Sequence, residues 1–283
     1  MPDVIMHVNY FEAGNTLATL FDKAKCFGYE GVELRGFRQD TATPDYLQEI
    51  KREWERTGLK HVILSCPAEL NNPSAAERAA SIEKCSAMLR QAAALGVKLF
   101  NAMAGTLLAE GAAYFEFARN GSAAATDEQW QWAVEGYQQL GAVADELGVR
   151  LAFETHNCYI HDLAKPTAEF LRRIGSPAVG ANLDMGNLII NANGESTVEA
   201  CRILGERIFY AHLKNLFRPT AGGWIVCALP DGVIDNRVLL RTLKGQGYNA
   251  PICLEAPRAG DRDHFARQDI EYIRWVLEGL DWA

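Results

Sequence analysis

The sequence predicts an α/β protein folded as a single (β/α)8 TIM barrel, and three observations lead to this prediction. Amphipathic helical segments alternate with short apolar segments along the whole chain. Seven of the apolar segments follow a glycine that can end the preceding helix in a left-handed conformation. An opening strand at about residues 4–9 brings the number of strands to eight, the number that closes a barrel of this kind.

The seven helix-to-strand junctions each combine a glycine with an apolar run. They are "CFGYEGVEL", "RTGLKHVIL", "ALGVKLFNA", "ELGVRLAFE", "RIGSPAVGANLD", "ILGERIFYAH" and "GQGYNAPICLE". Strands such as "KHVILSC" are apolar on both faces, as expected for parallel strands that helices cover. A doubly wound open sheet is the alternative, but the Gly-x-Gly-x-x-Gly signature common in that fold does not follow the first strand.

Helical periodicity predicts the segments between these strands. Leu17, Leu20, Phe21 and Ala24 recur at the spacing of one helical face. The other expected helices occupy residues 45–56, 75–95, 127–147, 167–174, 198–204, 236–243 and 267–280. Since no linker divides the chain, we expect one domain over residues 1–283 with an extended loop at about 105–125. This loop is either a lid over the catalytic end of the barrel or a surface excursion without catalytic importance.

Composition and charge limit the partners. With 283 residues, 48% apolar and 23% charged, the chain has the composition of a soluble globular protein. Its net charge of −8 argues against a nucleic acid partner, which would require clustered Lys and Arg. Seven single cysteines without a Cys-x-x-Cys pair are typical of a reducing compartment, so we expect a cytoplasmic location. Neither a signal peptide nor a long apolar run is apparent, so no membrane partner is expected.

Four predicted strands end on a side chain that can bind a metal ion. "RLAFETHN" contains Glu154, "VGANLDMGN" Asp184, "RIFYAHLKN" His212 and "APICLEAPR" Glu255. A single acid at a strand end is more often a helix cap or an ion-pair partner, but four at the same barrel end would converge on one mouth. Three carboxylates there would repel one another without a cation, and neutral imidazole binds the same ion.

The sequence therefore predicts one divalent metal ion bound by Glu154, Asp184, His212 and Glu255. Ligands that are mostly oxygen, with one nitrogen and no thiolate, favour Mn²⁺, Mg²⁺ or Co²⁺. Zn²⁺ is possible, although a closed structural zinc site is not expected.

The phrases "FETHN", "NLDMGN", "AHLKN" and "CLEAP", in this order, resemble the sugar isomerase/epimerase superfamily of xylose isomerase-like TIM barrels. The resemblance extends over nearly the whole chain, from "MHVNYF" to "ICLEA". Because that group includes ketose 3-epimerases, hydroxypyruvate isomerases and inosose dehydratases, it implies a metal-dependent enzyme with a small carbohydrate-like substrate. For the epimerase-like members it implies that Glu154 and Glu255 both bind the metal and transfer protons.

Such a site supports proton transfer next to a carbonyl group. A metal ion chelated by a carbonyl oxygen and the adjacent hydroxyl acidifies the intervening C–H bond and stabilises the resulting enediolate. Glu154 and Glu255 on opposite faces of the substrate would remove and return the proton. We expect an isomerase or epimerase of a small ketose, sugar acid or polyol-derived ketone. The alternative is a metal-dependent dehydratase, a lyase, acting on an inosose or dehydroshikimate type of substrate.

Three side chains near the expected mouth are candidates for binding substrate. Arg218, six residues after His212, resembles in position a substrate-binding Arg of ketose epimerases, and it can equally be a surface residue. Lys214 projects from the same side of its strand as His212, and either meets a substrate oxygen or pairs with a carboxylate. His156, two residues after Glu154, is expected to donate a hydrogen bond in the mouth.

Two positions depart from the ketose epimerase pattern. Asn187 stands where that pattern has a His three residues after Asp184. Its amide can still donate a hydrogen bond to a substrate oxygen, but it cannot take up a proton. Ile160 stands where the pattern has a second Glu, six residues after Glu154. Both changes weaken the assignment as a ketose 3-epimerase and leave the predicted metal site unchanged.

Other hypotheses concern single features of the chain. Glu33 in "VELRG" either serves the site or forms a salt bridge with Arg35. A DNA repair enzyme similar to endonuclease IV would need more metal ligands than six histidines offer and a basic face. A binding protein without activity would be favoured only if the ligand set had lost a member. Barrels of this kind often pair, so a homodimer or homotetramer is expected.

Overall fold

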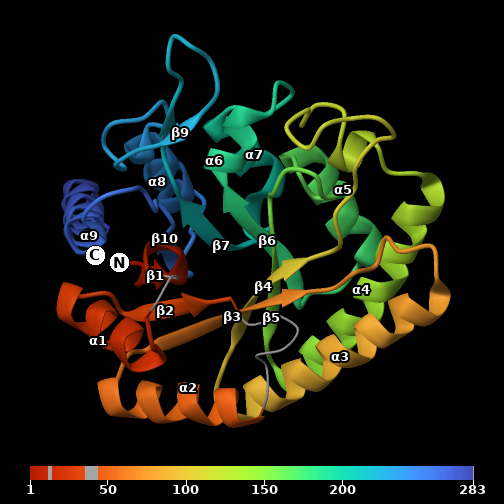
Figure 1. Ribbon diagram of the computed structural model, residues 1–283, viewed down its shortest axis with the longest axis horizontal. Helices are drawn as coiled ribbons and strands as arrows, with labels where there is room; N and C mark the ends of the chain where they lie inside the picture. The colour runs from red at the N-terminus through yellow and green to blue at the C-terminus, as the bar shows by residue number, and fades with distance from the viewer. Residues whose placement is uncertain (12–14, 36–43, 283) are drawn as a thin grey trace.

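A computed structural model describes residues 1–11, 15–35 and 44–282. Within these ranges, eight parallel strands close into a barrel in the order β1-β10-β7-β6-β5-β4-β3-β2, which confirms the predicted (β/α)8 fold (Figure 1). The strands are β1 (Val4–His7), β2 (Gly31–Leu34), β3 (His61–Pro67), β4 (Leu99–Met103), β5 (Arg150–Glu154), β6 (Val179–Asp184), β7 (Ile208–Leu213) and β10 (Ile252–Leu254). Closure is direct, because Ile5 of β1 pairs with Gly31 of β2 on one side and with Cys253 of β10 on the other.

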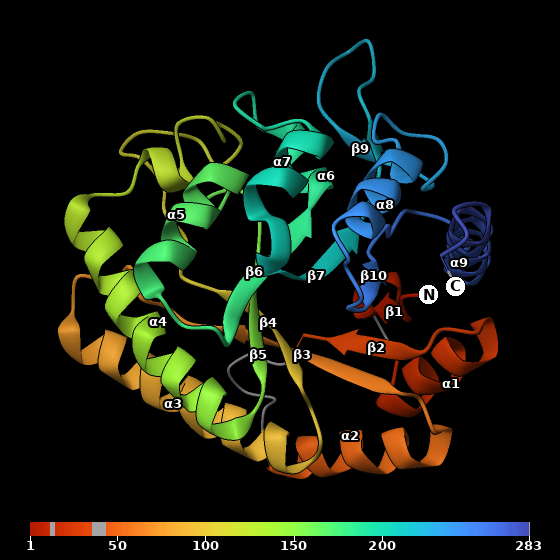
Figure 2. The same ribbon diagram turned by 180° about the vertical axis from the view of Figure 1, so that it is seen from behind.

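Helices surround the barrel, as the two opposite views show (Figures 1 and 2). In the described part of the chain they are α1 (Leu17–Phe27), α2 (Pro44–Thr57), α3 (Ala75–Ala94), α4 (Asp127–Leu147), α5 (Ala164–Ile174), α6 (Met185–Ile190), α7 (Thr197–Leu204), α8 (Asn236–Gly245) and α9 (Arg262–Gly279). Helix α1 buries the predicted face, begins where the Thr16 side chain accepts a hydrogen bond from Thr19 N, and ends at Gly28 with φ +87°. No helix among the described residues is both long and apolar enough to cross a membrane.

Two helices begin three or more residues earlier than the sequence predicted. Helix α5 starts at Ala164 instead of residue 167, because Pro166 lies in the first turn, where a backbone N–H has no partner within the helix. Helix α9 starts at Arg262 instead of residue 267, since the Asp261 side chain accepts a hydrogen bond from His264 N and caps this end.

Short elements were not predicted. They are α6, the 3-10 turns η1 (Val8–Tyr10), η2 (Gly121–Ala123) and η3 (Gly205–Arg207), and the antiparallel pair β8 (Leu216–Phe217) and β9 (Ile225–Val226). Elements of two to six residues complete too few turns or alternations to give a periodic pattern.

An apolar layer inside the barrel supports the strand ends. It consists of Ile5, Ile63, Leu99, Ala152, Phe209, Tyr210 and Cys253. Because side chains alternate along a strand, Ala152, Tyr210 and Cys253 share a face with the residues two positions later. Those residues are Glu154, His212 and Glu255. The interior layer therefore packs directly below the polar side chains at the carboxyl ends of β5, β7 and β10.

The segment between β4 and α4 packs on the segment between β5 and α5. Leu107 N donates a hydrogen bond to Cys158 O at 2.7 Å, and Ser122 N donates one to Asp162 Oδ2 at 3.2 Å. Gly121 has φ +65°, and a Cβ atom there would lie 2.2 Å from Asp162 Oδ2. The long segment is thus fitted closely against the chain that follows Glu154, and its role as a lid stays a prediction.

Candidate metal centre

The side chains of Glu154, Asp184, His212 and Glu255 converge at the carboxyl ends of the adjacent strands β5, β6, β7 and β10. One ligand atom from each lies within 4.8 Å of the others. All four residues are buried, and Asp184 and His212 have no exposed surface. We call these four residues the carboxylate–histidine cluster. The sequence predicted that these four residues would lie together, and metal binding by them stays a prediction.

A bound cation would stabilise the charged groups of the cluster. Burial raises the pKa of Asp184, and the carboxylates of Glu154 and Glu255 raise it further, against the opposing effect of Lys214. Burial alone would lower the pKa of His212, but the carboxylates of Glu33 and Glu154 raise it well above its usual range. A divalent ion would relieve both groups, because it offsets the crowded negative charge and leaves the imidazole neutral.

Asp184 supplies a second indication that a cation fits. Its Oδ1 accepts a hydrogen bond from Asn187 N at 3.1 Å and so caps the start of α6. Its Oδ2 is buried and receives no well-directed hydrogen bond, although Lys214 Nζ lies 3.0 Å away. A buried carboxylate oxygen without a proper donor is the kind of atom that a metal ion satisfies. The four residues therefore fit a divalent metal site.

Amide side chains hold the two glutamates in place. Asn101 Nδ2 donates to Glu154 Oε2 and Asn187 Nδ2 donates to Glu154 Oε1, both at 2.9 Å. Asn9 Nδ2 donates to Glu255 Oε1 at 2.5 Å. Asn187, predicted as a substrate-binding residue, thus contacts Glu154 directly. Asn101 was missed, although a lone amide inside the apolar segment "KLFNAM" was a usable signal.

Lys214 extends into the cluster. Its Nζ lies 3.0 Å from both Asp184 Oδ2 and Glu255 Oε2, and 3.4 Å from Asn187 Oδ1. Burial alone would lower the pKa of Lys214, but Asp184 and Glu255 raise it, so the ammonium stays charged. The ion pairing foreseen for Lys214 is therefore present, and its contact with substrate stays a prediction.

The other two predicted substrate-binding residues do not bond to the cluster. The half-buried His156 has Nδ1 3.0 Å from Asn157 O, and its ring lies edge-on to Tyr159. Arg218 is exposed just after β8 and forms no hydrogen bond or ion pair with any residue that the structure describes. Substrate binding by His156 and Arg218 stays a prediction.

His161, in the same segment as His156, has a structural role. It is fully buried, with Nδ1 2.6 Å from Glu154 O, and its Nε2 accepts a hydrogen bond from Ala104 N at 3.2 Å. Burial lowers the pKa of this imidazole to about 4, so it is neutral at pH 7. His161 therefore ties the end of β5 to the segment after β4.

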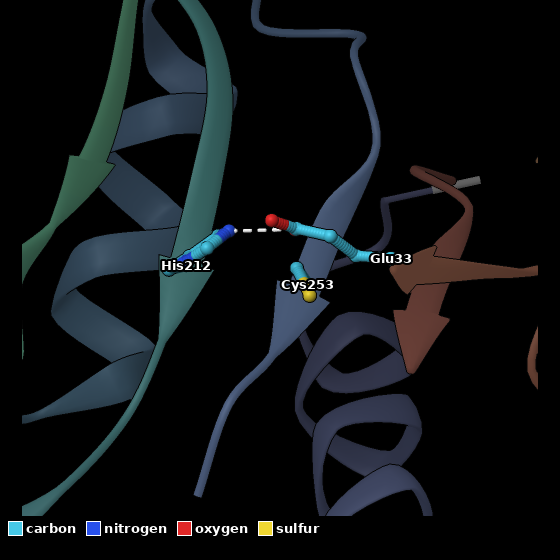
Figure 3. Close-up of side chains that lie close together, drawn as sticks. All are labelled: Glu33, His212 and Cys253. Carbon is cyan, nitrogen blue, oxygen red and sulfur yellow. Dashed lines mark hydrogen bonds and ion pairs between the residues drawn. The ribbon is translucent and has the colours of Figure 1, made fainter. Parts of the chain in front are cut away.

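Glu33 approaches the cluster from the opposite wall of the barrel. Figure 3 shows its side chain extending from β2 toward His212 on β7, beside Cys253 on β10. Glu33 Oε2 lies 2.8 Å from His212 Nε2 and accepts a hydrogen bond from Tyr210 OH at 2.8 Å. Glu33, His212 and Cys253 also lie close enough together to hold a metal ion. However, burial raises the pKa of the Cys253 thiol well above its usual range, so the thiol is protonated. A protonated thiol is a poor ligand.

A family model for xylose isomerase-like TIM barrels matches residues 21–276, most of the chain. The chain belongs to the xylose isomerase-like TIM barrel family. An inosose dehydratase of Geobacillus kaustophilus (strain HTA426) is 24% identical over 172 residues, which cover 55% of this chain and 55% of that protein. The chain thus spans about half the length of the curated relatives it matches.

Several solved structures share the fold at low identity. A D-psicose 3-epimerase in the presence of D-fructose has a TM-score of 0.78 at 17% identity, over 97% of this chain and 99% of that chain. The probable 3-DHS dehydratase AsbF of Bacillus anthracis has a TM-score of 0.76 at 17% identity, over 96% and 98%. A family protein from Mycobacterium smegmatis in complex with magnesium has a TM-score of 0.76 at 17% identity, over 99% and 98%. At such identities the likeness establishes the fold alone.

Proposed function

We propose that this protein is a divalent-metal-dependent enzyme that removes a proton next to a carbonyl group of a small, polyhydroxylated, carbohydrate-like substrate. The convergence of Glu154, Asp184, His212 and Glu255 within 4.8 Å carries the proposal. Three carboxylates and one imidazole form a donor set suited to Mg²⁺, Mn²⁺ or Co²⁺. Once bound, such an ion would polarise the carbonyl group and acidify the neighbouring C–H bond.

Glu154 and Glu255 are the proposed proton-transfer groups. Both oxygens of Glu154 accept hydrogen bonds from amides, which fix the plane of its carboxylate. Burial alone would raise the pKa of Glu255, but Lys214 and His7 lower it well below its usual range. Glu255 is therefore ionised, as a group that accepts a proton from an acidified C–H bond must be.

Among the possible outcomes, we favour dehydration, in which the β-hydroxyl leaves after the proton has been removed. This step needs a group that gives a proton to the departing hydroxide, and the Lys214 ammonium lies beside the cluster. A divalent ion that offset the charges of Asp184 and Glu255 would bring the raised pKa of Lys214 down toward the range of a general acid. Asn187 and Ile160 stand where the ketose epimerase pattern has a His and a Glu. The inosose dehydratase relative and the likeness to a 3-DHS dehydratase agree with this choice.

Isomerisation or epimerisation is the second candidate. Glu154 and Glu255 come from β5 and β10, which flank β6 and β7 in the barrel wall, so their carboxylates approach the cluster from two sides. Two bases on opposite faces of a substrate can remove a proton on one face and return one on the other. In that case Lys214 would bind a substrate oxygen.

The test combines metal analysis with solvent exchange. The purified protein, Glu154→Gln, His212→Ala and Lys214→Met would be analysed for bound metal and incubated in deuterated water with a panel of ketoses, inososes and keto acids. We expect metal in the parent and its loss in His212→Ala. Deuterium should enter the substrate at a carbon next to the carbonyl group in the parent, and not with Glu154→Gln.

Lys214→Met separates the two candidates. For a dehydratase, the parent product lacks one water, and Lys214→Met retains deuterium exchange while elimination slows by about 100-fold or more. For an isomerase or epimerase, substrate and product have equal mass. If the parent binds no divalent metal and the Glu154 and His212 variants behave like it, the convergence of the four side chains is structural and the proposal is wrong.

A further inference from the structure

The two nitrogens of the His212 ring face different groups. Nε2 lies 2.8 Å from Glu33 Oε2 (Figure 3). Nδ1 lies 3.2 Å from Glu255 Oε2 and 3.9 Å from Glu154 Oε2. Glu33 and His212 have no exposed surface, so water does not compete for these contacts. One edge of the ring is therefore occupied by Glu33, and the other faces the carboxylate–histidine cluster.

Glu33 acts only as an acceptor in this arrangement. Tyr210 OH donates to its Oε2 at 2.8 Å, and Asn101 Nδ2 lies 3.0 Å from its Oε1. A neutral imidazole carries one N–H, and the closer acceptor, 2.8 Å from Nε2 against 3.2 Å from Nδ1, favours that hydrogen on Nε2. The Nδ1 lone pair is then free on the side where Glu154 and Glu255 lie.

Asn101 connects Glu33 to a second residue of the cluster, Glu154. The same amide nitrogen lies 3.0 Å from Glu33 Oε1 and 2.9 Å from Glu154 Oε2, and Asn101 Oδ1 accepts a hydrogen bond from Asn182 Nδ2 at 3.2 Å. Asn101 is 3% exposed and lies between the two carboxylates. Glu33 is thus linked to His212 directly and to Glu154 through one side chain.

We propose that Glu33 is a positioning residue of the metal site: it fixes the orientation and tautomer of His212 so that Nδ1 is the nitrogen offered to the metal. This inference rests on the proposed function and deepens it. The contrary interpretation is that Glu33 merely fills the barrel with a buried ion pair. The two interpretations predict different effects of replacing Glu33. If Glu33 only forms a structural ion pair, its replacement changes stability and leaves metal affinity unchanged.

The test measures metal affinity and histidine tautomer together. Mn²⁺ or Mg²⁺ would be titrated calorimetrically into metal-free parent, Glu33→Gln and Glu33→Leu, with thermal unfolding of each recorded. Loss of an outer carboxylate partner of a ligating histidine typically weakens metal binding about 10–100-fold, which we expect for Glu33→Leu. Glu33→Gln keeps an acceptor oxygen, so its affinity should stay closer to that of the parent.

Nitrogen-15 NMR of histidine-labelled protein, recorded before and after Mg²⁺ is added, gives a second measurement that a change in stability alone would not alter. In the parent, Nε2 of His212 should carry the hydrogen, and the Nδ1 signal should shift when Mg²⁺ is added. With Glu33→Leu, the ring should show a mixture of tautomers. Glu53→Leu is the matched control, because Glu53 is a buried acid paired with Arg52 and Arg56 on α2. It should lower stability and leave metal affinity unchanged.

Each outcome separates this inference from the proposed function. Suppose that Glu33→Leu has the metal affinity and the His212 tautomer of the parent, and that His212→Ala loses metal binding. This result would contradict the role of Glu33 and still support the proposed metal site. Absence of metal binding in the parent would overturn both. If Glu33→Leu does not fold, Glu33→Asp takes its place, since it keeps the charge but is too short to reach Nε2. Parent-like affinity of Glu33→Asp would equally contradict the inference.

Discussion

The aliphatic chain of Lys214 lies against Gly186 so closely that a Cβ atom on Gly186 would come within 2.4 Å of Lys214 Cγ. Gly186→Ala should therefore push Lys214 away from Asp184 and Glu255. Because a positioned general acid commonly contributes about 10²–10⁴-fold to a rate, we expect turnover to fall at least about 10-fold. Steady-state kinetics would measure this fall, and calorimetric titration would show whether the same Cβ atom, 3.1 Å from Asp184 Oδ1, also weakens metal binding.

Gly245→Ala is the control for this substitution. Gly245 ends α8, and an added Cβ atom there would meet no other atom within 4 Å. It should leave turnover and metal affinity at the parent level. Parent-like turnover in Gly186→Ala would mean that the observed place of Lys214 is not needed for the reaction.

Binding of a divalent metal should stabilise the folded protein. A ligand that binds only the folded state at 100 times its dissociation constant adds about 2.7 kcal/mol to the free energy of unfolding. Urea unfolding of the parent with Mn²⁺, and again after treatment with a chelator, would measure this gain. The gain should vanish in His212→Ala. An equal gain in that variant would place the stabilising ion outside the carboxylate–histidine cluster.

The Asp162 carboxyl group should make stability depend on pH. Burial raises its pKa to about 6 from a usual 3.8, so the folded state holds this proton more tightly than the unfolded state does. Its stabilising contribution is complete below about pH 4 and is lost as the pH rises to about 6. Asp162→Asn, which can still accept the hydrogen bond from Ser122 N, should abolish this loss, which is at most about 3 kcal/mol.

Urea unfolding at pH 4.5 and pH 7 would test this prediction. The decrease in unfolding free energy between the two values should be smaller in Asp162→Asn than in the parent. Asp145→Asn, an exposed site on α4, should retain the parent difference. Identical pH dependence in all three proteins would show that Asp162 does not hold its proton in the folded state.

Asp269 on α9 should contribute strongly to stability. It has no exposed surface, accepts a hydrogen bond from Tyr10 OH at 2.7 Å, and pairs with Arg258 at 2.7 Å. Removing one partner of a buried pair costs about 3–5 kcal/mol, because the other charge is left uncompensated. We expect a loss of this size in the free energy of unfolding of Asp269→Ala.

Asp263→Ala on the same helix is the control for Asp269→Ala. Asp263 pairs with Lys23, but half of its side chain is exposed. Exposed pairs contribute about 1 kcal/mol or less, so the two losses should differ clearly in chemical denaturation. Similar losses would contradict the role assigned to burial.

Local chemistry explains what could be predicted from the sequence. Glycines at helix ends marked the strands, and the shared direction of parallel strands brought Glu154, Asp184, His212 and Glu255 to one end of the barrel. Helix α6 was missed, because the Asp184 carboxylate both caps this helix and belongs to the cluster, and only the second role was considered.

The contacts of the supporting residues could not be predicted, because their partners are remote in the sequence. Asn9 reaches Glu255 across 246 positions, Glu33 reaches His212 across 179, and Asn101 reaches Glu154 across 53. No local pattern reports such contacts. Glu33 was placed near the site as one of two hypotheses, and only the closed barrel reveals its contact with His212.

The first and second parts of the chain contribute different kinds of residue to the site. All four cluster residues lie in the second part, from Arg150 onward, whereas Glu33 and Asn101 lie in β2 and β4 and Asn9 lies in η1, directly after β1. A chimaera that joined the second part to the first half of another barrel would keep every proposed ligand and Asn187, and would lose Asn9, Glu33 and Asn101. Matching the four ligands alone therefore cannot establish that two barrels of this family share a working centre.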